Sequence, residues 1–218
     1  THVVVDGADP AFTRPTKPIG PFLTESEARE RGARLGWVVG EDAGRGYRRM
    51  VASPRPREIL ELAEIRALLD RGVLVVAAGG GGVPVVLDGG GYRGVEAVID
   101  KDLAAQRLAT ELHADALVLV TDVPRVLLDY GTDRARSIGE MTADEAQRYA
   151  EDHQFAEGSM GPKIRAAIEF VRCGGGTAVI TDAGRAGDSL DPAAASDPGS
   201  GTRIVARRTS DLHLGAAT

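Results

Sequence analysis

The sequence predicts an α/β protein in which helices cover both faces of a largely parallel sheet. Three short apolar runs do not alternate with polar residues, which is typical of strands buried on both faces; they span residues 73–78, 116–121 and 177–181. Leucine, isoleucine and alanine recur at helical spacing over residues 59–69 and 103–112. Strands that alternate with helices in this order indicate an α/β fold.

The composition favours one large domain that acts on small molecules. A chain of 218 residues is long enough for one domain with a small appended lobe. Its core is expected to consist of valine, leucine, isoleucine and alanine, because aromatic residues make up only 4% of the chain. The formal net charge of -6 argues against a nucleic-acid or anionic-membrane surface, since both require a basic patch.

The cysteine content and the hydropathy pattern favour a cytoplasmic protein. Cys173 is the only cysteine, so no internal disulfide is expected, and a reducing compartment is the default. No apolar run approaches membrane-spanning length, and no basic segment followed by an apolar one opens the chain.

Residues 7–55 interrupt the alternation of strands and helices. The prolines early in this segment predict irregular backbone. Thr24 and Glu27 have the spacing of a capping box, which predicts a helix that runs to about Leu35. Residues 37–54 then read as two strand-like runs joined by a glycine-containing loop, as in a β-hairpin. We expect a small lobe that stands off the main sheet and acts as a lid over a site.

The sequence excludes one familiar phosphate-binding motif and argues against another. The sequence G-x-x-x-x-G-K-[ST] is absent, which excludes a P-loop NTPase. A G-x-G-x-x-G match occurs at Gly89, Gly91 and Gly94, but strand-like runs flank it on both sides. This context predicts a hairpin turn, whereas a dinucleotide site requires a turn from strand to helix.

A run of four glycines is the better candidate for binding an anion. Gly79, Gly80, Gly81 and Gly82 follow the predicted strand at residues 73–78, and open α/β sheets bind their ligands beyond the carboxyl ends of strands. Glycines let backbone N–H groups approach an anion without obstruction from side chains. The alternative is a flexible loop without a ligand.

The lysines are unusual because the chain has 23 arginines and only three lysines, at Lys17, Lys101 and Lys163. In a chain that uses arginine for nearly all of its basic residues, a lysine is more often required for function than a lysine in an average protein. An ammonium group is a compact, mobile point charge, whereas a guanidinium is a planar fork that prefers fixed bidentate geometry. A phosphoryl group in transfer favours the ammonium.

Two of these lysines are predicted at helix N-termini. Lys101 lies between Asp100, a candidate N-cap, and Asp102. Lys163 follows Pro162, which suits the first position of a helix. Because helix N-termini attract anions, the pair predicts an anion site in which Asp102 orients both ammonium groups. The alternatives are a solvated cation at a capped helix for Lys101 and a surface charge in the first turn for Lys163.

Five segments together resemble a known family. "VVVDGADPAFTRPTKPIGPF", "VVAAGGGGVPVV", "GVEAVIDKDLAA", "LVTDVPRVLLDYGT" and "AEGSMGPKIRAAIEF" are similar, in order and spacing, to the carbamate kinases of the amino acid kinase superfamily. The resemblance implies a three-layer αβα sandwich around a mainly parallel eight-stranded sheet. It also implies that residues 1–218 form one kinase domain, with residues 7–55 as a protruding lid subdomain, and that the protein is a homodimer.

The resemblance also implies an activity and a set of site residues. The family transfers a phosphoryl group reversibly between carbamoyl phosphate and Mg-ADP, giving ATP and carbamate, at the end of the arginine deiminase route. Mg²⁺ is expected to enter on the nucleotide phosphates, with no protein metal ligands. Lys17, Lys101, Asp102 and Lys163 would be catalytic, and Gly79, Gly80, Gly81, Gly82 and Lys17 would bind the carbamoyl or phosphoryl group. The residues expected to bind the nucleotide are Thr121, Asp122, Val123, Val126, Tyr130, Met160 and Lys163, with roles as ordinary core or loop residues as the alternative.

The chain also departs from the family pattern. Family members begin with a strand and a Gly-Gly-Asn loop, followed by a loop containing His-Gly-Asn-Gly, and neither occurs here. We expect the chain to correspond to the C-terminal two thirds of the pattern, as a fragment or a truncated protein. Residues 184–200 match the pattern loosely, and residues 187–201, rich in Ala, Asp, Pro, Gly and Ser, are read as a loop. Two other functions stay open, namely another phosphotransferase of the superfamily and a non-catalytic nucleotide-binding protein.

Overall fold

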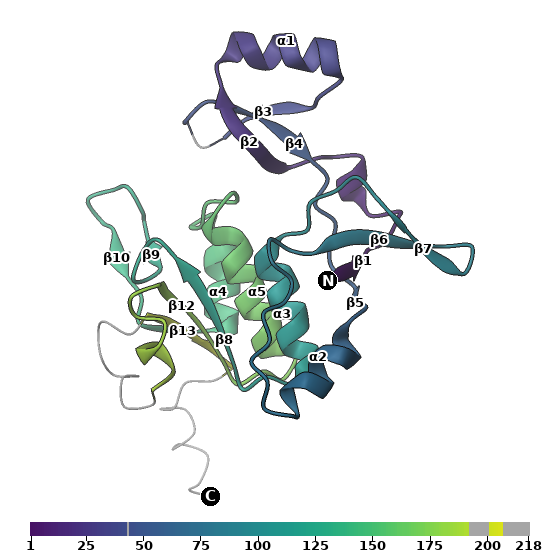
Figure 1. Cartoon of the computed structure of the whole chain (residues 1–218). Helices are drawn as coiled ribbons and strands as arrows, with labels where there is room; N and C mark the ends of the chain where they lie inside the picture. The colour runs from purple at the N-terminus through teal and green to yellow at the C-terminus, as the bar shows by residue number, and fades with distance from the viewer. Residues whose placement is uncertain (43, 192–200, 207–218) are drawn as a thin grey trace, which may run out of the picture. The chain divides into compact units, whose positions relative to one another are not determined.

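The computed structural model describes residues 1–42, 44–191 and 201–206, and its contacts divide the chain into two compact units, residues 1–104 and 105–218. Each unit combines strands and helices, so the predicted α/β class is confirmed (Figure 1). None of the helices in the described ranges has the length and apolar character that a bilayer crossing requires.

The first unit contains two sheets. Its elements are β1 (His2–Val4), a 3-10 turn (Pro10–Phe12), β2 (Lys17–Leu23), α1 (Glu25–Leu35), β3 (Val39–Glu41), β4 (Tyr47–Val51), β5 (Glu58–Ile59), α2 (Leu62–Leu69), β6 (Val83–Asp88), β7 (Gly91–Gly94) and the start of α3 (Lys101–Leu112). One sheet has the order β5-β1-β6-β7, in which β1 and β6 are parallel and the outer strands are antiparallel to their neighbours. Val3 and Ile59 face each other in this sheet and are almost fully buried.

The second sheet of this unit has the order β2-β4-β3 and is antiparallel throughout. It packs with α1 to form the structure at the top of Figure 1, which we call the lobe (residues 17–51). The capping box is confirmed, because the Glu27 amide donates to Thr24 Oγ1 and the Thr24 amide donates to Glu27 Oε2. The hairpin predicted over residues 37–54 is confirmed as β3 and β4.

The proline-rich segment was predicted to be irregular, and this prediction is wrong for residues 17–23. Strand β2 includes Pro18 and Pro21. It lies at an edge of its sheet, where a residue without an N–H group can be tolerated. The pairing register shifts between Ile19 and Leu23, so β2 is an irregular edge strand.

The strand predicted at residues 73–78 is absent. This segment lies outside every strand of the described residues, and Leu74 and Val76 are 91% and 94% exposed. A strand buried on both faces needs neighbouring strands and covering helices, and within the described residues no strand pairs with this segment. The helix predicted from residue 59 also starts later, at Leu62, because Ile59 belongs to β5.

The glycine-rich segment around Gly89 is a hairpin turn, as predicted. Strands β6 and β7 are antiparallel, with Asp88 opposite Gly91. Gly89 and Gly90 have φ angles of 57° and 88°. Two successive residues with positive φ form the tight turn that joins adjacent antiparallel strands. The dinucleotide-binding alternative is therefore excluded at this position.

The second unit contains a mixed sheet covered by two helices. Its elements are the rest of α3, β8 (Ala116–Thr121), β9 (Leu127–Leu128), β10 (Arg136–Ser137), β11 (Glu140–Thr142), α4 (Ala143–Glu151), α5 (Met160–Arg172), β12 (Thr177–Asp182), a 3-10 turn (Asp188–Leu190) and β13 (Thr202–Val205). The main sheet has the order β11-β13-β12-β8, and β9 pairs with β10. The strands predicted at residues 116–121 and 177–181 are confirmed as the parallel pair β8 and β12.

Helix α5 forms much of the core of this unit. Ile164, Ala167 and Phe170 recur at helical spacing along it and are fully buried. Helices α4 and α5 pack together, and α5 also contacts β8, β12 and β13. Val179 and Ile180 of β12 are likewise fully buried, so this helix and strand share one apolar core. Part of the loosely matched segment 184–200, residues 192–200, lies outside the described residues.

Candidate functional site

The N-terminus of α3 is built as predicted. Asp100 Oδ1 accepts hydrogen bonds from the amides of Asp102 at 2.9 Å and Leu103 at 3.3 Å, which confirms Asp100 as the N-cap. Lys101 is the first residue of the helix, and its Nζ lies 3.3 Å from Asp102 Oδ1. The Lys101 side chain is 57% exposed, whereas that of Asp102 is 10% exposed. A fixed carboxylate therefore holds a lysine that solutes can reach.

The four glycines divide into two pairs with different surroundings. A Cβ atom on Gly81 would lie 2.3 Å from the Ile99 carbonyl oxygen, and one on Gly82 would lie 2.6 Å from a methyl group of Val3. Both glycines also have positive φ angles, so close packing requires glycine at these positions. Cβ atoms on Gly79 and Gly80 would meet no atom within 4 Å. The loop thus packs beside Ile99, next to the cap of α3, and keeps an open face for a ligand.

Lys17 also belongs to this cluster. Its Nζ lies 2.5 Å from Asp100 Oδ2, the carboxylate oxygen that does not cap α3. Burial would raise the pKa of Asp100, but the hydrogen bond and charge of Lys17, together with the amides of Asp102 and Leu103, lower it below the usual 3.8. The structure therefore joins Lys17, Lys101 and Asp102 through Asp100 within the first unit.

The predicted nucleotide residues lie in the second unit. Thr121 is the last residue of β8, and its Oγ1 donates to Asp122 Oδ1 at 3.1 Å. Helix α5 runs back to the start of β12, which is parallel to β8, so its first turn lies at the carboxyl edge of both strands. Met160 and Lys163 are in this first turn and share that edge with Thr121.

Lys163 is a buried lysine rather than a surface charge. Its exposed fraction is 5%. Pro162 was predicted to open the helix, but α5 begins two residues earlier, at Met160. Proline is still tolerated there, because amides in the first turn have no acceptor within the helix. Lysine is almost never buried without a partner for its ammonium group, which sets Lys163 apart from an ordinary helix cation.

The remaining predicted nucleotide residues differ in accessibility. Val126 is fully buried, and its amide donates to Thr202 Oγ1 at 2.9 Å, so its side chain is a core residue. Tyr130 is 74% exposed, and Val123 is half-buried. A nucleotide can reach the ring of Tyr130 but not the side chain of Val126. The meeting of Lys101 with Lys163 stays a prediction, because they belong to different units.

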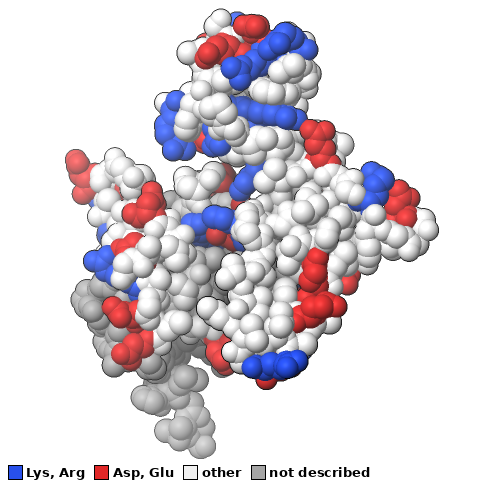
Figure 2. All heavy atoms as spheres, viewed as in Figure 1, with Lys and Arg blue, Asp and Glu red and all other residues white. Residues whose placement is uncertain are grey.

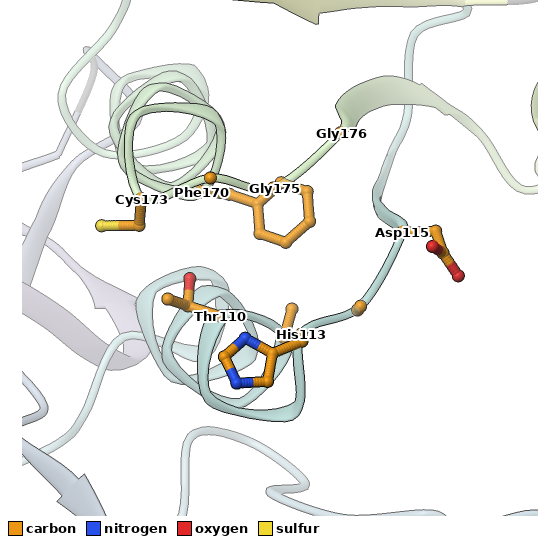
Figure 3. Close-up of a pocket in the computed structure, with 10 residues that line it drawn as sticks. Thr110, His113, Asp115, Phe170, Cys173, Gly175 and Gly176 are labelled. Carbon is orange, nitrogen blue, oxygen red and sulfur yellow. The ribbon is translucent and has the colours of Figure 1, made fainter.

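A pocket of about 260 Å³ in the second unit lies at the amino ends of β8 and β12, opposite the edge that carries Thr121 (Figure 3). The residues that line it directly precede β8 and β12 in the chain, whereas Thr121 is the last residue of β8. Phe170 lines the pocket, and Cys173 and Asp115 point away from each other on opposite sides of its ring (Figure 3). Ligands of open α/β sheets bind beyond the carboxyl ends of strands, so this pocket is not the predicted nucleotide site.

Nowhere in the described ranges do three or more histidine, cysteine, aspartate or glutamate side chains gather as a metal site. The cluster in the first unit instead presents ammonium groups, a helix N-terminus and an open glycine face. This combination suits an anionic group such as a phosphate.

Comparison with known proteins assigns the chain to a family. The model described as "Amino acid kinase family" matches residues 22–182, which is most of the chain. The chain belongs to the amino acid kinase family. Within it, the chain is 48% identical over 191 residues to a carbamate kinase of Pyrococcus furiosus, an alignment that covers 88% of this chain and 61% of the relative. The chain thus spans about three fifths of the length of this curated relative.

Solved structures of amino acid kinases agree with the fold. A carbamate kinase from Giardia lamblia bound to citric acid superposes on this chain with a TM-score of 0.84 at 44% identity. The alignment covers 94% of this chain and 63% of the Giardia chain. The Giardia enzyme bound to AMP-PNP gives a TM-score of 0.77 with the same identity and coverage.

Sequence reasoning missed one residue of the cluster. It assigned Asp100 only the role of N-cap, because the partner of its second oxygen is 83 positions away in the chain. The signal available in the sequence was an aspartate, suited to cap a helix, placed directly before a rare lysine.

Proposed function

We propose that the protein is a carbamate kinase, an ATP-dependent phosphotransferase. It would transfer a phosphoryl group reversibly between carbamoyl phosphate and Mg-ADP, giving ATP and carbamate. The observation that carries this proposal is the cluster at the N-terminus of α3, where Lys17 pairs with Asp100, Lys101 pairs with Asp102, and Gly81 packs against Ile99. The similarity to relatives named carbamate kinase supports the same substrates.

The chemistry requires positioning and charge neutralisation more than acid or base catalysis. A β-phosphate oxygen of ADP attacks phosphorus, the bond from phosphorus to the carbamate oxygen breaks, and carbamate leaves with that electron pair. No covalent enzyme intermediate forms. Lys101, oriented by Asp102, would neutralise the phosphoryl oxygens together with Lys163 and Lys17. In the reverse direction carbamate is already anionic, so it needs no general base.

The remaining site residues divide between the two substrates. Gly79 and Gly80 would present their open face to the carbamoyl phosphate, while Gly81 and Gly82 hold the loop in place. Mg²⁺ would arrive on the nucleotide as Mg-ADP or Mg-ATP. The residues assigned to the nucleotide are Thr121, Asp122, Val123, Val126, Tyr130, Met160 and Lys163; for Val126 we propose a supporting role because its side chain is buried.

The lobe would act as a lid over anionic substrates. It carries seven basic and five acidic residues, although the whole chain has a net charge of -6. In Figure 2 the blue side chains of Lys and Arg gather on the lobe at the top of the molecule. A local excess of positive charge raises the concentration of an anionic substrate near its surface. We also propose that the protein is a cytoplasmic homodimer that acts at the end of arginine breakdown, as the resemblance implies.

The test is ATP formation by the purified 218-residue chain with carbamoyl phosphate and Mg-ADP, alongside ADP binding by calorimetry. We expect faster ATP formation from carbamoyl phosphate than from acetyl phosphate and, in the reverse direction, faster phosphorylation of carbamate than of acetate or a nucleoside monophosphate. Faster transfer involving another acceptor would assign the chain to a different phosphotransferase of the family. ADP binding by a folded chain without any turnover would instead support the non-catalytic alternative.

A further inference from the structure

Within the first unit, the lobe and Ala52, the residue that directly follows it, contact three alternate residues before α3, namely Glu96, Val98 and Asp100. Arg49 Nη2 pairs with Glu96 Oε1 at 2.8 Å, the Val98 amide donates to the Ala52 carbonyl at 2.9 Å, and Lys17 pairs with Asp100. Lys17 begins β2 and is opposite Val51, the last residue of β4. The two strands that enter and leave the lobe therefore converge on one short segment, residues 96–100.

These contacts differ greatly in their exposure to solvent. The side chain of Glu96 is 85% exposed, so its pairing with Arg49 is expected to contribute little. The side chain of Asp100 is only 8% exposed, and that of Lys17 is 28% exposed. A charged pair shielded from water is screened less by salt and other solutes, so it fixes geometry more strongly. Lys17 and Asp100 thus form the main charged contact of the attachment.

Asp100 also divides its two oxygens between two elements. Oδ1 holds the first turn of α3 through the amides of Asp102 and Leu103, and Oδ2 holds Lys17 of the lobe. One carboxylate therefore sets the position of Lys17 relative to the helix that begins at Lys101. An ammonium group has three N–H donors, so a bond to Asp100 leaves donors for a phosphoryl oxygen.

We propose that Asp100 is a positioning residue that fixes the lobe against the N-terminus of α3, so that Lys17 and Lys101 approach the transferred phosphoryl group as a pair. The part of this inference that concerns catalysis rests on the proposed function. The part that concerns attachment of the lobe does not depend on any substrate. Asp100 itself need not touch the substrate, because it acts through Lys17.

The competing explanation is that Asp100 only caps α3, and Asp100→Asn separates the two roles. Asparagine caps helices about as well as aspartate. Its amide carries no charge and has a single acceptor oxygen, and the amides of Asp102 and Leu103 at the cap occupy both lone pairs of that oxygen, so it cannot also accept from Lys17. Lys17→Met removes the same contact and leaves the cap intact. Glu96→Gln is a matched control, because it makes the same change from carboxylate to amide at the exposed contact with the lobe.

The first experiment is amide hydrogen exchange on the ligand-free 218-residue chain, comparing the wild type, Asp100→Asn, Lys17→Met, the double variant and Glu96→Gln. We expect amides of residues 17–51 to exchange severalfold faster in Asp100→Asn and in Lys17→Met than in the wild type. The double variant should exchange no faster than either single variant. In Glu96→Gln, the amides of residues 17–51 should exchange as in the wild type. In every variant, the amides in the first turn of α3 should also exchange as in the wild type. Faster exchange in α3, with an unchanged lobe, would overturn the proposal in favour of a cap alone.

The second experiment measures ATP formation by the same variants. We expect Asp100→Asn to lower kcat at least tenfold with little change in the KM for ADP, and Glu96→Gln to leave both unchanged. An unchanged kcat in an active Asp100→Asn variant would overturn the catalytic part. If the wild-type chain formed no ATP, the proposed function would fail, and hydrogen exchange would still decide the attachment of the lobe.

Discussion

Gly81 packs against the backbone of Ile99 so closely that a Cβ atom at residue 81 would lie 2.3 Å from the Ile99 carbonyl oxygen. Its neighbour Gly80 would place a Cβ atom in open space. The glycine loop is therefore held on one side by the segment that leads into α3 and open on the other. This relationship makes the structural and binding roles of the loop separable by experiment.

Alanine substitutions at two neighbouring positions of the loop should affect different properties, stability at Gly81 and turnover at Gly80. Gly81→Ala should destabilise the chain by about 2 kcal/mol or more, because the methyl group overlaps backbone and the φ angle of 131° disfavours alanine. Gly80→Ala should change stability by less than about 0.5 kcal/mol but lower turnover about tenfold or more by displacing the substrate. Urea unfolding and ATP formation measure the two effects. Normal turnover in Gly80→Ala would contradict the assignment of the open face.

Two buried threonines in the second unit give a test of its core. Thr202 Oγ1 accepts from the Val126 amide and donates to the Ile138 carbonyl, whereas Thr181 Oγ1 is buried without a partner in the described part of the chain. Thr202→Val should cost about 1–3 kcal/mol because it leaves two buried groups unsatisfied. Thr181→Val should be neutral or stabilising by up to about 1 kcal/mol. Equal destabilisation in chemical unfolding would count against this hydrogen-bond arrangement.

The stabilising effect of Asp100 should depend on pH in the acidic range. Its folded-state pKa lies below the usual 3.8, so its charge stabilises the fold above that value, and this stabilisation disappears as the pH falls through the lowered pKa. The difference in unfolding free energy between the wild type and Asp100→Asn should stay constant from about pH 7 to pH 5 and shrink below about pH 4. Urea titrations across this range measure it. A difference that grows on acidification would have the wrong sign.

The exposed segment 73–78 should promote self-association of this chain. Leu74 and Val76 are almost fully exposed, and extended apolar segments without a partner pair with other chains. Replacing both with threonine should reduce concentration-dependent association measured by light scattering. Leu87→Thr is the control, because Leu87 is 69% exposed but lies in a paired strand. If the double variant associates as strongly as the wild type, another surface is responsible.

Local sequence signals predicted the elements that local interactions determine. The capping box of Thr24 and the turn at Gly89 depend on nearby residues, and both were identified correctly. The apolar run at residues 73–78 failed because strand formation depends on a partner as well as on composition. β2 was missed because the tolerance of an edge strand for proline depends on sheet order.

For the candidate site, sequence identified the individual lysines and the cap of α3 but not their assembly. The pairing of Lys17 with Asp100 joins residues 83 positions apart, and no periodic pattern encodes such a contact. The different surroundings of Gly80 and Gly81 likewise depend on how Ile99 packs, which a run of four identical residues cannot reveal.

The most direct test of the central claim is the rate of ATP formation from carbamoyl phosphate and Mg-ADP by Lys101→Arg. Arg93→Lys is the control, because Arg93 lies on an exposed hairpin and the exchange again conserves charge. A guanidinium cannot reproduce the compact charge of an ammonium group, so we expect Lys101→Arg to lower kcat about 100-fold or more and Arg93→Lys to be normal. Near-normal turnover by Lys101→Arg would contradict the account, because any cation would then suffice at the start of α3.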